Sequence, residues 1–209
     1  MPMAAASRPS WRSVRQGRVV ARLSCTLMLM PVASAVVSAQ HSTAMKPLSE
    51  TVFQIERDGL TLELAPLPRE AVRAFMIGRG LSQEDAALAA ERGCIFRSAI
   101  GNAATSPEGP ALRVALSDWR VHPDGGASRG LALRQHWDAF WRARKLAEAS
   151  AVAFHWALFP SEQVFAPTDH NWGFLSFELP PGTRFSLDVS WTTGASTYTD
   201  RLDGLTCAP

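Results

Sequence analysis

Hydrophobic and polar residues alternate with a period of two in several stretches of this chain, as is typical of β-strands that bury one face. The first two stretches cover residues 53–55 and 60–64, in which every second residue is Phe, Ile or Leu. Asp58 and Gly59 lie between them. Asp-Gly favours a tight turn because glycine accepts a positive φ, so the pattern predicts an antiparallel hairpin here.

Helical signals appear first at residues 69–93. Residues 69–77 fit either a short helix or a strand, and the Gly-Arg-Gly that follows breaks the pattern. Ser82 then has the position of an N-cap, with an acidic residue three positions later, and Gly93 has the position of a C-terminal stop. We predict a helix between these two residues.

A second helix is predicted within residues 131–150, because Trp137, Phe140 and Trp141 fall on one stripe. In residues 152–158, Val, Phe, Trp and Leu then alternate with alanine and histidine. Apolar or small side chains on both faces predict a central β-strand there, with another layer packed against its alanine side.

Two further patterns concern strands. The alternation in residues 111–121 changes phase near residues 117–118, which indicates a β-bulge. The clearest alternation covers residues 175–179 and 185–191, on either side of a Pro-Pro-Gly turn. This arrangement predicts a second hairpin.

Seven or so short strands joined by turns rich in Pro and Gly predict a mainly β fold. We expect an antiparallel β-sandwich, of which the immunoglobulin-like architecture is one form, with two inserted helices (α+β). Residues 51–209 would form this single domain, and the polar residues 40–50 would be a flexible lead-in.

The first 39 residues have the pattern of a secretory signal peptide. They contain five Arg and no acidic residue, then an apolar run of about 15 residues, then Val37-Ser38-Ala39. The alternative is an uncleaved membrane anchor, but the run is shorter than the ~20 residues that a span needs. We therefore expect cleavage after Ala39 and a periplasmic or secreted protein, with the periplasm preferred.

Cleavage would change the charge of the protein. The chain has 209 residues and a formal net charge of +2. Removing residues 1–39 takes away five positive charges and no negative one, which leaves 170 residues with a net charge of −3. The basic balance that would suggest nucleic acid therefore belongs to the leader, and we expect no nucleic-acid partner and no stable membrane span after cleavage.

Cys94 and Cys207 remain after the leader, which contains Cys25, is removed. Two cysteines in an exported chain usually pair, because the compartment is oxidising. A redox-active or metal-binding pair would need a close spacing such as Cys-x-x-Cys, and these two lie far apart in the sequence. We predict a structural disulfide between them.

Several motifs of known chemistry are absent: the sequence has no His-Glu-x-x-His and no phosphate-binding Gly-x-x-x-x-Gly-Lys. Its one Gly-x-Ser-x-Gly match, residues 126–130, lies in a stretch of turn residues and does not have the strand-to-helix context of a nucleophile elbow. Asp169, His170 and Trp172 form the best candidate for a ligand-binding site, because the carboxylate can hold an imidazole and the indole can stack on a ligand. The alternative is structural: the polar residues stabilise a turn and the indole fills one end of the sandwich. No nucleophile is identifiable beside them, so no catalytic residue is assigned.

Two histidines are candidate metal ligands. His41 would be the second residue after cleavage, where the free amine and the imidazole could bind copper, and His170 is a further candidate. The alternative for His41 is a disordered polar N-terminus. His155, on the alanine side of the predicted strand, is interpreted as a hydrogen-bonded core residue.

Three functional hypotheses follow. The first is an exported, non-catalytic domain that binds a protein or a small ligand through residues 169–172. The second is a periplasmic metal-handling protein, most simply for copper. The third is a small secreted hydrolase whose residues the sequence does not identify. The missing motifs favour the first hypothesis and argue against an enzyme.

Overall fold

A computed structural model describes residues 51–209. The predicted signal peptide and lead-in lie outside these residues. The described chain begins with the hairpin of β1 (Phe53–Arg57) and β2 (Leu60–Pro66), as predicted. Asp58 and Gly59 both have positive φ values, of 49° and 85°, as a two-residue turn of this kind requires.

Strands in the described part form two antiparallel sheets. The first sheet has the order β1-β2-β3-β7, and the second has the order β5-β8-β4-β6, with β9 paired to β8. The remaining strands are β3 (Ile95–Asn102), β4 (Leu112–Ala115), β5 (Arg120–Pro123), β6 (Glu162–Phe165), β7 (His170–Ser176), β8 (Arg184–Thr193) and β9 (Ser196–Thr206).

Apolar side chains from both sheets meet in one core. Phe96 of β3 and Phe185 of β8, for example, meet edge to face with ring centroids 5.8 Å apart. Trp191 of β8 is also buried there, as its alternation predicted. The expectation of a mainly β fold with two packed antiparallel sheets is thus confirmed.

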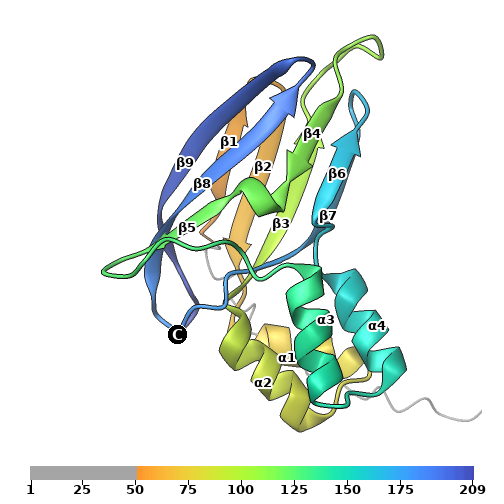
Figure 1. The fold of residues 1–209 in the computed structure, drawn as a ribbon, viewed down its shortest axis with the longest axis vertical. Helices are drawn as coiled ribbons and strands as arrows, with labels where there is room; N and C mark the ends of the chain where they lie inside the picture. Colours follow the sequence, from red (N-terminus) through yellow and green to blue (C-terminus); the bar gives the residue numbers. More distant parts are fainter. Residues whose placement is uncertain (1–50) are drawn as a thin grey trace, which may run out of the picture. The chain divides into compact units, whose positions relative to one another are not determined.

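Four helices accompany the sheets, where two were expected. They are α1 (Arg69–Gly78), α2 (Gln83–Gly93), α3 (Arg134–Ala143) and α4 (Glu148–Ala157). Figure 1 shows them together at one end of the sandwich. They have a core of their own, which includes Trp137, Trp141 and Phe154, so the predicted aromatic stripe of α3 is buried. Within residues 51–209, no helix is long and apolar enough to cross a membrane.

The ends of α2 follow local signals. The Ser82 hydroxyl accepts a hydrogen bond from the backbone N–H of Asp85 at 3.0 Å, which confirms the predicted N-cap. The helix ends at Gly93, but the left-handed residue is Cys94, with φ 40°. Gly93 is needed for space instead, since a Cβ there would lie 2.6 Å from the side chain of Ile95.

Residues 152–158 lie in α4 and its C-cap, so the predicted central strand is wrong. The apparent period of two came from four large apolar residues at alternate positions. Only Phe154 and Leu158, four residues apart, are buried, and this spacing is that of a helix face. Val152 and Trp156 are 50% and 70% exposed. Alternation alone could not show this difference.

The predicted hairpin across residues 175–191 is also wrong, because its two strands belong to different sheets. β7 pairs with β3, whereas β8 pairs with β4, β5 and β9. Residues 177–183 cross from one sheet to the other. The alternation correctly identified buried positions, but each strand finds its partner elsewhere in the chain.

The expected bulge near residues 117–118 is a short 3₁₀ turn, Leu116–Asp118, between β4 and β5. Both strands pair with β8, before and after the turn, in different registers. The phase change in the sequence was therefore real, and the inserted residues form a turn instead of a simple bulge.

A disulfide joins Cys94 and Cys207, whose Cα atoms lie 5.2 Å apart, so the predicted pairing is confirmed. Cys94 lies between α2 and β3, and Cys207 follows β9 directly. The bond therefore ties the end of the chain to the junction between the helices and the first sheet.

Candidate functional site

The predicted stretch at residues 169–173 leads into and forms the first part of β7. The carboxylate of Asp169 accepts a hydrogen bond from the backbone N–H of His170 at 2.9 Å. The amide oxygen of Asn171 accepts one from the backbone N–H of Trp172 at 2.8 Å. These are local bonds of the kind that Asp and Asn form at turns. Asp169 thus holds the backbone and not the imidazole of His170.

His170 and Trp172 lie two residues apart on β7 and share its outer face. Their partners on β3 are the small residues Gly101 and Ala99. Trp172 is 66% exposed, so it does not fill the end of the sandwich. The structure therefore brings His170 and Trp172 together on an open sheet face, but it does not surround them with a pocket.

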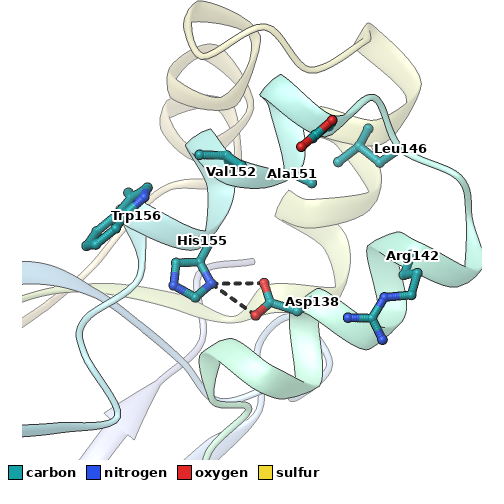
Figure 2. A pocket seen from close by; sticks show the side chains of 8 residues that line it. Asp138, Arg142, Leu146, Ala151, Val152, His155 and Trp156 are labelled. Atoms are coloured by element: carbon teal, nitrogen blue, oxygen red, sulfur yellow. Dashed lines mark hydrogen bonds and ion pairs between the residues drawn. The ribbon is translucent and has the colours of Figure 1, made fainter.

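A groove of about 470 Å³ lies instead between α3 and α4 (Figure 2). Sequence reasoning missed it because residues 152–158 were assigned to a strand. Its apolar lining is Leu146, Ala151, Val152 and Trp156, and its polar lining is Asp138, Arg142, Glu148 and His155. Concave surfaces that combine apolar walls with a few polar groups are typical of ligand sites.

The histidine of the groove is paired with a carboxylate. His155 Nδ1 lies 3.0 Å from both carboxylate oxygens of Asp138, which projects from the facing helix α3. Because a carboxylate accepts hydrogen bonds, Nδ1 of His155 is the donor in this contact. His155 is thus a partly exposed groove residue, and its interpretation as a core histidine is wrong. Its 17-residue separation from Asp138 gave no signal in the sequence.

The indole of Trp156 is held from one side. The guanidinium of Arg134 lies over its ring, 5.1 Å from the centroid, and donates a hydrogen bond from Nε to the carbonyl of Leu158 at 3.0 Å. Burial lowers the pKa of Arg134, and the nearby Asp138 carboxylate opposes this effect; the group remains charged at neutral pH. One face of the indole is therefore covered by a fixed cation, while most of the side chain stays exposed.

Arg142 and Glu148 also line the groove, on α3 and α4 respectively. Among the residues that the structure describes, neither side chain has an ion pair or a side-chain hydrogen bond. By contrast, Arg144, close to Arg142 in sequence, pairs with Glu84 at 3.4 Å. The groove thus presents two opposite charges that the fold itself does not use.

The lining residues define what the groove can do. None of the eight carries a hydroxyl or a thiol, so the pair of His155 and Asp138 has no hydroxyl or thiol nucleophile beside it in the groove. The arrangement provides an aromatic platform, an imidazole and two charged groups without partners among the described residues. These groups are suited to bind and orient a ligand.

Metal ligands do not cluster in the described part of the chain. Residues 51–209 contain no group of three or more His, Cys, Asp or Glu side chains that could hold a metal ion. His41, the main copper candidate, lies outside the described residues. His122 and His136 are engaged with carboxylates, those of Asp188 at 2.6 Å and Glu178 at 2.9 Å.

Glu178 is the centre of a charged cluster between the helices and the sandwich. Its carboxylate accepts a hydrogen bond from Arg92 Nε at 3.1 Å and pairs with His136. Burial raises the pKa of Glu178, whereas the bonds to Arg92 and His136 lower it. The lowering is the larger effect, so the pKa falls below its usual 4.5. A second hollow of about 400 Å³ lies here. Its main charges are already used by these contacts, so we do not assign it as a ligand site.

Glu178→Gln should lower the free energy of unfolding by about 1–2 kcal/mol at pH 7, because the amide cannot replace a carboxylate bonded to Arg92 and His136. A carboxyl group whose pKa is lowered by folding stabilises above its unfolded pKa, and this contribution is lost as the pH falls through the folded pKa. Urea unfolding at pH 7, 5 and 3 should therefore show the difference disappearing at low pH.

Glu91→Gln is the matched control, since Glu91 lines the same hollow and is exposed. Its substitution should change the free energy by less than about 0.5 kcal/mol. A Glu178→Gln deficit of equal size at all three pH values would contradict the assigned charge interaction.

Comparisons with known proteins do not extend this description. A scan against protein-family models, a search of curated proteins and a search of solved structures each found no match to this chain.

Proposed function

We propose that this protein is an exported, non-catalytic domain that binds a small ligand in the groove between α3 and α4. The observation that carries the proposal is the exposed indole of Trp156, fixed over Arg134 at one end of a groove that also contains unused charges. A surface tryptophan of this exposure needs a reason, because burying an indole is strongly favourable.

Export is supported by the disulfide between Cys94 and Cys207. Such bonds persist in oxidising compartments and are rare in the cytosol of most organisms. Together with the signal pattern of residues 1–39, this favours the periplasm or the cell exterior as the place of action.

Binding is favoured over covalent catalysis because the groove offers no nucleophile for the imidazole of His155 to activate. The groove is also favoured over the sheet face of His170 and Trp172. On that face the small neighbours Ala99 and Gly101 leave the indole without a surrounding pocket. A small ligand buries more of its surface in a groove than on an open sheet.

Trp156→Ala should weaken binding of the amphiphilic dye anilinonaphthalene sulfonate about tenfold, since the loss of one aromatic contact is worth about 1–1.5 kcal/mol. Fluorescence titration of the purified domain measures this. The stability of the variant should remain close to that of the original protein, because the side chain is 70% exposed.

Trp172→Ala is the matched control, because this tryptophan is 66% exposed but lies on β7, away from the groove lining. It should leave dye affinity and melting temperature unchanged. If Trp172→Ala weakened binding of the dye and Trp156→Ala did not, the binding site would be the sheet face. If neither substitution had an effect, the groove would not be the site.

A further inference from the structure

The two facing helices give the groove a direction. Asp138 and Arg142 follow Arg134 at intervals of four residues on α3, and so share one face. Arg134 near the start of α3 contacts Trp156 and Leu158 at the end of α4. The helices are therefore antiparallel, and the end of α3 lies beside the start of α4 (Figure 1).

Glu148, Val152 and Trp156 share one face of α4 in the same way. Because the helices are antiparallel, Arg142 and Glu148 lie at the same end of the groove, and Trp156 lies at the other. Figure 2 shows Trp156 and Arg142 at opposite ends, with His155 and Asp138 between them. The groove thus has a charged end and an aromatic end.

Some charged groups in the groove are paired within the fold, and others are not. Asp138 is bonded to His155 and lies near Arg134, so its charge is compensated by the fold. Arg142 and Glu148 share one end but form no ion pair with each other. A ligand with a single charge would satisfy one of them and be repelled by the other. A ligand that carries an ammonium group and a carboxylate on the same carbon atom would satisfy both Arg142 and Glu148.

Distances along α4 limit the rest of the ligand. With a rise of 1.5 Å per residue, Val152 lies about 6 Å and Trp156 about 12 Å from Glu148 along the helix axis. A large apolar side chain held at the charged end therefore reaches Val152 and extends toward the indole of Trp156.

We infer that the ligand is a zwitterion, an α-amino acid with a large apolar side chain. Its carboxylate pairs with Arg142, its ammonium pairs with Glu148, and its side chain packs against Val152 and Trp156. This inference rests on the proposed function, because it assigns a ligand class to the same groove. Bidentate pairing of a guanidinium with a carboxylate is geometrically specific, which explains why an arginine lies there.

Four probes test the inference by calorimetric titration of the full domain: L-phenylalanine, 3-phenylpropionate, phenethylamine and L-alanine. The second lacks the ammonium group, the third lacks the carboxylate and the fourth lacks the large side chain. L-phenylalanine should bind at least about tenfold more tightly than each of the other three, since each omits one contact.

Two variants identify the charges. Arg142→Gln should weaken the binding of L-phenylalanine about tenfold, whereas the binding of phenethylamine should not weaken, because the substitution removes a like charge that repels its ammonium group. Glu148→Gln should weaken the binding of L-phenylalanine by a similar factor, whereas the binding of 3-phenylpropionate should not weaken, because the substitution removes a like charge that repels its carboxylate. Both side chains are exposed and unpaired, so neither variant should alter the melting temperature by more than one or two degrees.

Results of two kinds would overturn the inference. If 3-phenylpropionate or phenethylamine bound as tightly as L-phenylalanine, the ligand would not be zwitterionic. If Trp156→Ala still weakened the binding of that probe, the groove would remain the site. If no probe bound, and the dye titration also gave no dependence on Trp156, the ligand class and the proposed function would both be wrong.

Discussion

Replacing Cys94 and Cys207 together with Ala should lower the free energy of unfolding by about 4 kcal/mol. The bond closes a loop between residues that lie 113 positions apart, so it removes much conformational entropy from the unfolded chain. Both cysteines are buried, and they connect the C-terminal end of β9 to the α2–β3 junction. Urea unfolding of the oxidised protein and of the variant measures the difference.

Reduction provides the control for this prediction. Incubation of the original protein with a thiol reductant should reproduce most of the loss, whereas the same treatment of the double variant should change nothing. The left-handed backbone at Cys94, with φ 40°, is equally strained for Cys and Ala, so it does not contribute to the comparison. A double variant within 1 kcal/mol of the oxidised protein would show that the bond does not stabilise the fold.

Features that depend on a few neighbouring residues were predictable from the sequence. The Asp58-Gly59 turn and the Ser82 cap are local, and their backbone hydrogen bonds follow from residue type and spacing. The pairing of Cys94 and Cys207 followed from a count of cysteines in a chain predicted to be exported. The aromatic stripe of α3 was visible because Trp137 and Trp141 lie one helical turn apart.

Features that depend on distant partners were not predictable in this way. The alternation on either side of residues 180–182 indicates which side chains are buried. The same side chains would be buried whether β7 and β8 paired with each other or with strands from other parts of the chain. In residues 152–158, the large apolar residues alternate as they would in a strand, although the segment is a helix that buries only Phe154 and Leu158. Tertiary packing decided both cases.

The candidate site shows the same limit. Exposure of Trp172 and the open position of His170 beside it agree with a surface role, but their selection rested on residue types alone. The groove was missed because its walls come from two helices, one of which was assigned to a strand. Once residues 152–158 are helical, Trp156 and Val152 lie on one face, and His155 comes within reach of Asp138.

Trp137→Ala should lower the free energy of unfolding by about 4 kcal/mol, because it leaves a cavity in the core of the helices. The indole is fully buried, and its ring lies 5.0 Å from that of Phe154 on α4 and 5.7 Å from that of Trp141. Its Nε1–H donates to the hydroxyl of Ser176 on β7 at 3.0 Å. Trp137 therefore connects α3 to α4, which form the groove, and also to the first sheet.

Phenylalanine at the same position separates packing from hydrogen bonding. Trp137→Phe keeps most of the ring volume but removes the donor to Ser176, whereas Trp141→Phe removes an indole N–H that has no acceptor among the described residues. Both tryptophans are buried on α3, so the lost volume is similar. Trp137→Phe should therefore destabilise the domain by about 1–2 kcal/mol more than Trp141→Phe in urea unfolding. Equal losses would show that the bond to Ser176 contributes nothing, and that packing alone holds α3 on the sheet.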